Sequence, residues 1–165
     1  MEAPPHRRLA GSRVHSTCLE DRMSSDAERL EIETTVAPDD IQFLDDRLYE
    51  FNVAATGIQD GQVLGIFVRD ARGAIEAGLS GWTWGDCCRI EKLWVREDLR
   101  GGGLGRRLVC AAEQEAARRG CRQVTLDSHS FQAPEFYQKL GYELWAVLDG
   151  YPSPHRQCYL RKTIR

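Results

Sequence analysis

The chain has 165 residues, of which 42% are hydrophobic and 28% charged, and its formal net charge is -3. This length and balance fit one globular domain with its own core, and they exclude a collagen, a coiled coil and a wholly disordered chain. The slightly negative net charge does not indicate the basic surface that nucleic-acid-binding proteins carry. No run of apolar residues is long enough for a helix that crosses a bilayer. We therefore expect a cytoplasmic protein with neither a nucleic-acid nor a membrane partner.

The six cysteines could form disulfides or hold a metal, and the sequence disfavours both. The chain is long enough to bury a core without covalent staples, and its first residues lack the apolar run of a secretory signal. Cys87 and Cys88 are adjacent rather than at C-x-x-C spacing, and no pair of histidines lies near a cysteine at ligand spacing. We expect reduced thiols and no metal.

Residues 1–29 show no hydrophobic periodicity and are predicted to be a disordered extension. Met23 is an alternative start of the natural chain, which N-terminal mass spectrometry of the native protein would test. The folded domain is predicted to occupy residues 30–165.

The first half of this domain predicts one helix and four strands. Alternation of apolar and polar residues predicts a strand over Leu30–Val36. Pro38, followed by two acids, opens a helix with an apolar stripe. Three strands of an antiparallel meander then follow, over Gln62–Arg69, Ala74–Trp84 and Cys87–Arg96. The stripe of the helix consists of Ile41, Leu44, Leu48 and Phe51.

The second half alternates helices and strands. A glycine-rich segment leads into a helix over Leu104–Arg119, which Gly120 ends. The remaining elements are a strand at Gln123–Asp127, a short helix at Ala133–Leu140, and strands at Tyr142–Leu148 and Cys158–Ile164. The order predicts a single α/β (α+β) domain with a mixed, mostly antiparallel sheet of about seven strands flanked by helices.

The segment Arg100–Arg106 carries the strongest chemical signal. A strand runs into glycines, and the glycines run into a helix N-terminus, where free backbone N–H groups and the helix dipole favour a pyrophosphate. Gly105 is followed by arginines rather than Lys-Ser/Thr, so the segment is not a Walker A loop, and the spacing of its glycines does not fit the Rossmann fingerprint. The alternative is a glycine-rich turn without a ligand.

Two blocks resemble the GNAT superfamily of N-acetyltransferases. Arg100-Gly-Gly-Gly-Leu-Gly105 matches its R/Q-x-x-G-x-G/A signature, and the preceding Ile90–Val95 looks like its fourth strand. The stretch Ala133–Tyr142 is similar to its A-x-x-[LF]-Y-x-K-L-G-[FY] element. The resemblance covers about residues 30 to 165 and implies the GNAT fold, acetyl-CoA as co-substrate and a primary amine as acceptor.

The resemblance also implies which residues hold acetyl-CoA. Backbone groups of Leu93–Val95 would hold the pantetheine arm, and the N–H groups of Arg100–Arg106 the pyrophosphate. Ser130 stands where many members carry a cofactor-binding Asn, and its side chain has a shorter reach. The predicted cofactor residues are Leu93, Trp94, Val95, Arg100, Gly101, Gly102, Gly103, Leu104, Gly105, Arg106, Ser130 and Phe136.

Tyr137 and Glu91 are the predicted catalytic residues. Tyr137 falls on the family's frequent general acid, which protonates the leaving thiolate; the alternative is a core tyrosine. The position where some members carry a base Glu holds Arg89, and Glu91 lies two residues further along the strand. Glu91 could accept the amine proton directly or through water, or be an ordinary strand carboxylate. Asp127 and His129 are reserve candidates.

Residues 31–60 carry eight acids and one arginine. Such an excess could attract a cationic amine, or it could be a solvated surface, and the four tryptophans could line a pocket or belong to the core. We predict direct acetyl transfer to a small-molecule or peptide amine, with a homodimer as one option. The alternative hypothesis is an acyl-CoA-binding regulatory or interaction module without turnover.

Overall fold

The computed structural model describes residues 30–164, and its contacts divide the chain into two units, residues 1–42 and 43–165. In the first unit, residues 30–37 precede helix α1 (Pro38–Thr56) and form no strand. The predicted strand at Leu30–Val36 is therefore wrong, because alternation makes a strand only where a neighbouring strand satisfies its N–H and C=O groups. The predicted extension over residues 1–29 and the alternative start at Met23 lie outside the described residues.

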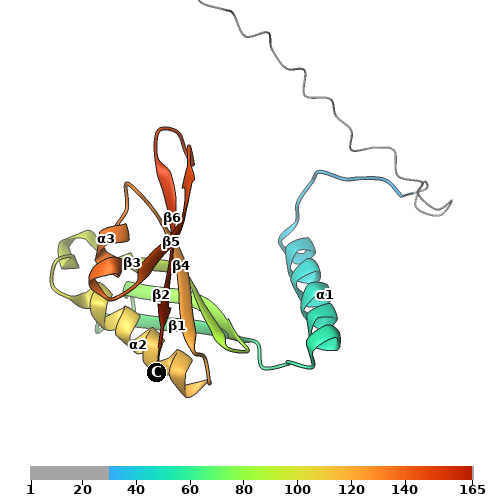
Figure 1. Ribbon diagram of the computed structural model, residues 1–165, viewed down its shortest axis with the longest axis horizontal. Helices are drawn as coiled ribbons and strands as arrows, with labels where there is room; N and C mark the ends of the chain where they lie inside the picture. The colour runs from blue at the N-terminus through green and yellow to red at the C-terminus, as the bar shows by residue number, and fades with distance from the viewer. Residues whose placement is uncertain (1–29, 165) are drawn as a thin grey trace, which may run out of the picture. The chain divides into compact units, whose positions relative to one another are not determined.

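The second unit contains one six-stranded sheet in the order β1-β2-β3-β4-β6-β5 (Figure 1). Neighbouring strands are antiparallel except for β3 and β4, which are parallel. This confirms the predicted mixed, mostly antiparallel sheet, with one strand fewer because residues 30–36 do not join it. The strands are β1 (Gln62–Arg69), β2 (Ile75–Trp84), β3 (Cys87–Val95), β4 (Gln123–His129), β5 (Glu143–Asp149) and β6 (Arg156–Thr163).

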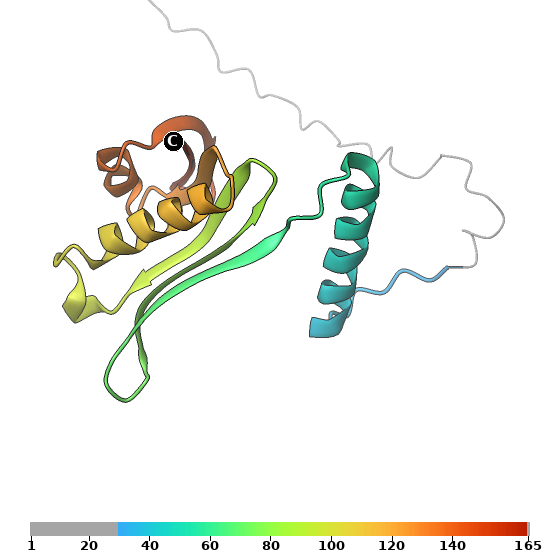
Figure 2. The ribbon, with the colours of Figure 1, turned by 90° about the horizontal axis from the view of Figure 1, so that it is seen from below.

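Helix α2 (Leu104–Arg118) is the crossover between the parallel strands β3 and β4, and it lies across one face of the sheet (Figure 2). A short 3-10 helix, η2 (Glu97–Leu99), precedes it, and helix α3 (Pro134–Lys139) follows β4. One face of α2 is buried, and it packs on side chains from the sheet. The buried residues of α2 are Leu108, Val109, Ala112 and Ala116; those they join include Leu64, Leu79, Val124, Leu126 and Leu160.

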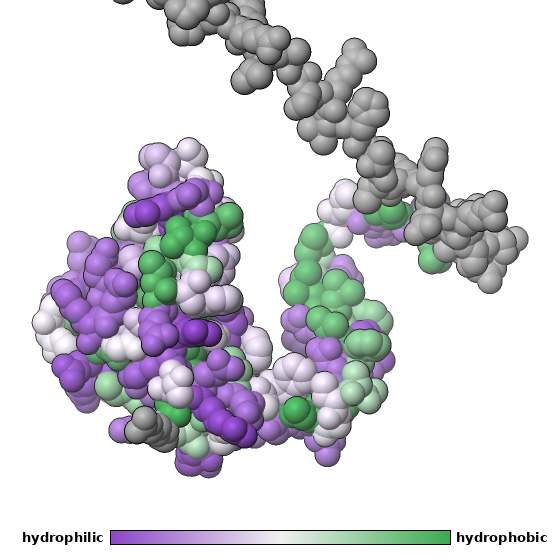
Figure 3. Space-filling view, in the orientation of Figure 1, coloured by the Kyte–Doolittle hydropathy of each residue, from purple (hydrophilic) through white to green (hydrophobic). Residues whose placement is uncertain are grey.

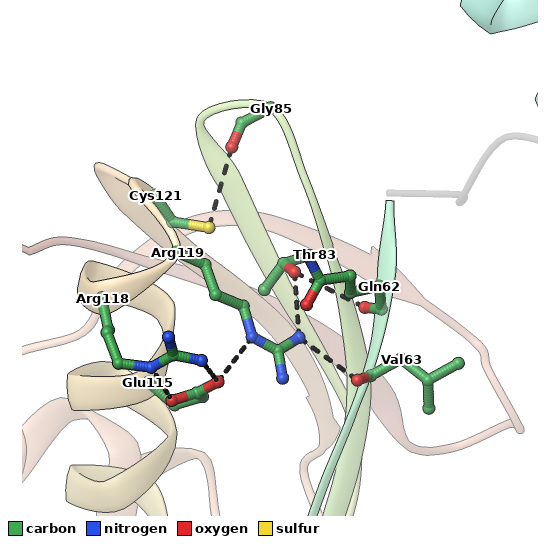
Figure 4. A network of polar contacts seen from close by, with 8 residues as sticks. All are labelled: Gln62, Val63, Thr83, Gly85, Glu115, Arg118, Arg119 and Cys121. Atoms are coloured by element: carbon green, nitrogen blue, oxygen red, sulfur yellow. Dashed lines mark hydrogen bonds and ion pairs between the residues drawn. The ribbon is translucent and has the colours of Figure 1, made fainter. Parts of the chain in front are cut away.

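Polar contacts fix α2 to both halves of the sheet. Arg119 Nη1 donates hydrogen bonds to the Val63 carbonyl oxygen at 3.2 Å and to Thr83 Oγ1 at 3.1 Å, and Arg119 Nε donates to Glu115 at 2.7 Å (Figure 4). On the other half, Lys162 Nζ of β6 donates to both carboxylate oxygens of Glu113, at 2.9 and 2.8 Å. The helix is thereby held in register with the strands on each side of the β3–β4 pair.

Helix α1 is confirmed as a helix, and its apolar side chains remain at the surface. Leu44 is 61% exposed, Leu48 60% and Phe51 68%, and apolar patches are visible over α1 in Figure 3. None of the helices in residues 30–164 combines the length and the hydropathy that crossing a membrane requires.

Candidate active site

The parallel strands β3 and β4 pair over only part of their length. Their ladder consists of Cys87 with Gln123, Cys88 with Val124, and Arg89 with Thr125, whereas β3 continues to Val95 and β4 to His129. Beyond Arg89 the two strands therefore run on without pairing to each other, and an opening forms in the middle of the sheet. A cavity of about 950 Å³ lies at this opening, lined by residues of β3, β4, α3 and the loop that leads into α2.

A β-bulge in β3 faces this opening. Ser80 pairs with Lys92 and Gly81 pairs with Ile90, so Glu91 is the extra residue and is left unpaired. A bulge bends its strand and redirects the side chain it carries. Glu91 lines the cavity, and no hydrogen bond or ion pair of its carboxylate is found within residues 30–164. The bulge thus places a free carboxylate beside the split.

The glycine-rich loop closes one end of the cavity. Gly101 and Gly103 have left-handed backbone conformations, with φ of +78° and +82°, and Gly103 is the N-cap of α2. A Cβ on either glycine would meet no other atom within 4 Å, so space lies in front of this backbone. No side chain caps the helix, and its first N–H groups are therefore available to an anion. Arg100 Nε donates a hydrogen bond to the Val95 carbonyl oxygen at 3.1 Å, which ties the loop to the end of β3.

Tyr137 lies on α3, whose first residue, Pro134, is preorganised for a helix start. Its side chain is only 7% exposed and packs edge-on against Phe136 and Tyr142, with ring centroids 5.0 and 5.8 Å away. Burial, and to a smaller extent the charge of Asp127, raises the pKa of Tyr137 to about 12. Tyr137 lines the cavity, so a phenol that stays protonated at neutral pH is positioned there.

An ion pair bridges the two strands where their ladder ends. Arg89 Nη2 donates to Asp127 Oδ1 at 2.6 Å, and Gln157 Nε2 donates to Asp127 Oδ2, also at 2.6 Å. Both carboxylate oxygens of Asp127 therefore have partners. These side chains lie on the face of the sheet opposite to buried Leu126 and Ser128, because neighbouring residues of a strand alternate between faces.

Comparison with known proteins agrees with this geometry. Residues 15–142 match the family model "Acetyltransferase (GNAT) family". Blasticidin-S acetyltransferase of Streptomyces morookaense is 38% identical over 95 residues, which are 55% of this chain and 68% of that protein. An acetyltransferase of Agrobacterium fabrum is 32% identical over 97 residues, 59% of this chain and 71% of its own. The crystal structure of a Bacillus cereus acetyltransferase has a TM-score of 0.69 and 30% identity, covering 82% of this chain and 98% of that one.

The chain belongs to the GNAT family of acetyltransferases. The resemblance seen in the sequence is thereby confirmed, as are the predicted fold class and the expectation of an acyltransferase enzyme.

The structure brings most of the predicted GNAT site residues to one cavity. Gly102 and Ser130 are absent from its lining. Ser130 instead pairs with the start of β6: its N–H donates to the Arg156 carbonyl oxygen at 2.8 Å, and its Oγ accepts from the Arg156 N–H at 3.1 Å. The predicted residues that line the cavity are Glu91, Leu93, Trp94, Val95, Arg100, Gly101, Gly103, Leu104, Gly105, Arg106, Phe136 and Tyr137.

Two features of the site were not predicted from the sequence. Gly81 is needed for the bulge, since a Cβ there would lie 1.9 Å from the Arg89 carbonyl oxygen. A glycine inside a strand is the sequence signal for such a close approach. Gln132 lines the cavity, and its Oε1 accepts a hydrogen bond from the His129 N–H at 2.9 Å, which shapes the loop after β4. A loop glutamine has no comparable signal.

The cysteines within residues 30–164 and the acidic residues 31–60 are not part of the cavity lining. The five cysteines within residues 30–164 are free thiols, and burial raises the pKa of Cys88 to about 12, which makes its thiol unreactive. Within the same residues, no three metal-binding side chains come together. The cavity lining includes none of residues 31–60, and their predicted attraction for a cationic acceptor stays a prediction.

Proposed function

We propose that this GNAT protein transfers the acetyl group of acetyl-CoA to a primary amine of a small acceptor by direct attack. The observation that carries the proposal is the opening between β3 and β4, which joins an anion-binding helix N-terminus to a buried, protonated tyrosine within one cavity. An extended substrate with a pyrophosphate at one end and a thioester at the other fits this arrangement.

Acetyl-CoA has a counterpart in the cavity for each of its parts. The N–H groups at the start of α2, together with Arg100 and Arg106, suit the pyrophosphate. The unpaired edge of β3 offers backbone groups of Leu93–Val95 to the amides of the pantetheine arm. The thioester would then lie near the bulge at Glu91, where the strands begin to separate.

The proposed reaction needs one base and one acid. The amine nitrogen attacks the thioester carbonyl carbon and loses a proton to Glu91, directly or through water. The carbon–sulfur bond breaks, and Tyr137 shares its proton with the leaving sulfur, which ends as the thiol of coenzyme A. The proton lost by the amine restores the phenol through solvent, and the products are an acetamide and free coenzyme A.

The relative from Streptomyces supports a small-molecule acceptor. That protein is named blasticidin-S acetyltransferase and is 38% identical to this chain over the aligned residues.

Two measurements, made one after the other, test the proposal. Isothermal titration with acetyl-CoA, with ATP and NAD as controls, tests the cofactor; binding of acetyl-CoA alone is expected. Turnover with a panel of primary amines, followed by mass spectrometry, tests the reaction. Failure to bind acetyl-CoA would overturn the proposal.

Tyr137→Phe separates catalysis from binding. We expect kcat to fall about 100-fold while the Kd for acetyl-CoA stays unchanged, because only the proton donor is lost. Tyr142→Phe is the matched control, since Tyr142 packs against Tyr137 but does not line the cavity. Acetyl-CoA binding without turnover of any amine would favour the alternative hypothesis, an acyl-CoA-binding module.

A further inference from the structure

Four aromatic rings meet at the end of β4, and we call them the aromatic cluster: His129, Phe131, Tyr151 and His155. His129 stacks on Phe131 with ring centroids 5.1 Å apart and an interplanar angle of 22°. His129 also contacts Tyr151 at 5.5 Å, and Phe131 meets His155 edge-on at 4.9 Å. The rings come from β4, the loop after it and the β5–β6 hairpin, so only the fold brings them together.

Backbone hydrogen bonds hold the cluster in place. The two hydrogen bonds between Ser130 and Arg156 join the Phe131 loop to the first residue of β6, next to the tip of the β5–β6 hairpin. At the hairpin tip, the His155 N–H donates to the Pro152 carbonyl oxygen at 2.6 Å, and the Tyr151 N–H donates to the His155 carbonyl oxygen at 3.1 Å. The prolines in the tip further restrict its backbone. The segments that carry the cluster are thus held together by backbone hydrogen bonds.

The cluster stays open and borders the cavity. Phe131 is 55% exposed and Tyr151 52% exposed, and Phe131 lines the cavity. His129 lies on the same face of β4 as Asp127, two residues earlier, because alternate residues of a strand share a face. Half-exposed aromatic rings that gather beside a cavity are a common feature of ligand sites.

We infer that the aromatic cluster binds a planar, nitrogen-containing ring of the acceptor, so that the preferred substrates are primary amines attached to a heteroaromatic ring. This inference rests on the proposed function. Exposed ring faces offer stacking to a flat ring, and the two imidazoles offer a hydrogen bond to a ring nitrogen. Because the segments that carry these rings are already held by hydrogen bonds, the rings lose little conformational entropy when such a ligand binds, and the site is preorganised.

The experiment compares two primary amines of similar size, pyridylmethylamine, with a flat heteroaromatic ring, and cyclohexylmethylamine, with a saturated one. The readout is the ratio of their kcat/KM values, measured in the wild-type protein and in Phe131→Leu. Comparing this ratio between proteins cancels the intrinsic reactivity of each amine. We expect Phe131→Leu to lower the ratio about 5- to 10-fold, mainly through the KM of the pyridyl amine.

Phe67→Leu is the matched control, because Phe67 is 50% exposed and lies on β1, outside the cluster and the cavity lining. Its ratio is expected to equal that of the wild type. If Phe131→Leu does not fold, Tyr151→Leu at the hairpin tip tests the same cluster. The Kd for acetyl-CoA is measured for each variant and is expected to stay unchanged.

Three results would overturn the inference: an equal loss for both amines, an unchanged ratio, or a weaker Kd for acetyl-CoA as the only effect. If the wild type acetylates neither amine, saturation-transfer NMR with pyridylmethylamine tests ring binding directly, with acetyl-CoA present or absent. Ring saturation that Phe131→Leu abolishes supports the inference even where the proposed function fails. No saturation, or the same saturation in both proteins, overturns it.

Discussion

The carbonyl oxygen of Arg89 lies 1.9 Å from the point where a Cβ on Gly81 would stand. No side chain other than the hydrogen of glycine fits there, since the nearest atom belongs to backbone and cannot rotate away. The contact lies at the register shift between β2 and β3, where Glu91 is left unpaired. Gly81 therefore permits the bulge that places Glu91 beside the opening between β3 and β4.

Gly81→Ala is expected to move β3, lower the free energy of unfolding by about 1–3 kcal/mol and reduce turnover. Urea unfolding and kcat measurements check this. Gly78→Ala, in the same strand, is the control: its Cβ would meet the ring of Phe67, which is half exposed and can turn away. If the two variants lost the same unfolding free energy and the same kcat, the close contact with the Arg89 carbonyl oxygen would not be the cause.

Gly103→Ala is expected to destabilise the loop before α2, because Gly103 has φ of +82° and an L-residue pays about 1–2 kcal/mol in that region. The variant is also expected to bind acetyl-CoA more weakly, which titration calorimetry measures. Gly102→Ala is the control for stability alone: its Cβ would lie 3.6 Å from the Leu99 carbonyl oxygen, an ordinary contact. A Gly103→Ala protein as stable as wild type would contradict the assignment of backbone strain.

Glu91 and Asp127 are the two carboxylates that line the cavity, and the structure distinguishes them as bases. Both oxygens of Asp127 accept hydrogen bonds, from Arg89 and Gln157, whereas Glu91 has no such partner within residues 30–164. We expect Glu91→Gln to lower kcat about 100-fold, and Asp127→Asn to lower it less than about 10-fold. The reverse order would transfer the role of base to Asp127.

Glu115 is expected to make the stability of the fold depend on pH. Hydrogen bonds from Arg118 and then Arg119 lower the pKa of Glu115 from 4.5 to about 2. Because the pKa is lower in the folded state, the ionised carboxylate stabilises the fold at pH values above the pKa of the unfolded chain, 4.5. This stabilisation is lost as the pH falls from 4.5 to about 2. Glu115→Gln should therefore be less stable than wild type at neutral pH, with the difference shrinking toward about pH 2.

Urea unfolding of both proteins across this pH range measures the difference. Glu143→Gln is the control, since its carboxylate is 3.9 Å from Arg161 and 77% exposed. A difference between wild type and Glu115→Gln that is the same at all pH values would show that the ion pairs of Glu115 do not stabilise the fold.

Local signals in the sequence were sufficient for most elements of the fold. The turns at Gly73 and Gly85 have positive φ, as glycine allows, and they separate the strands of the meander where the sequence places them. The strand at Leu30–Val36 fails for a non-local reason. Its alternation is a local pattern, whereas a ladder depends on a neighbouring strand that the pattern does not specify.

The sequence by itself determined the family, the order of the α-helices and strands from α1 onward, the glycine-rich start of α2 and the position of Tyr137 on a short helix. These features depend on glycine conformation, apolar periodicity and short motifs, all of which act within a few residues. Only the tertiary structure decided where β3 and β4 part, that Arg89 pairs with Asp127, and that Ser130 joins β6 to place Phe131 beside His155. The physical reason is that these contacts join residues distant in the chain, and their partners are chosen by the packing of the whole sheet rather than by local conformational preference.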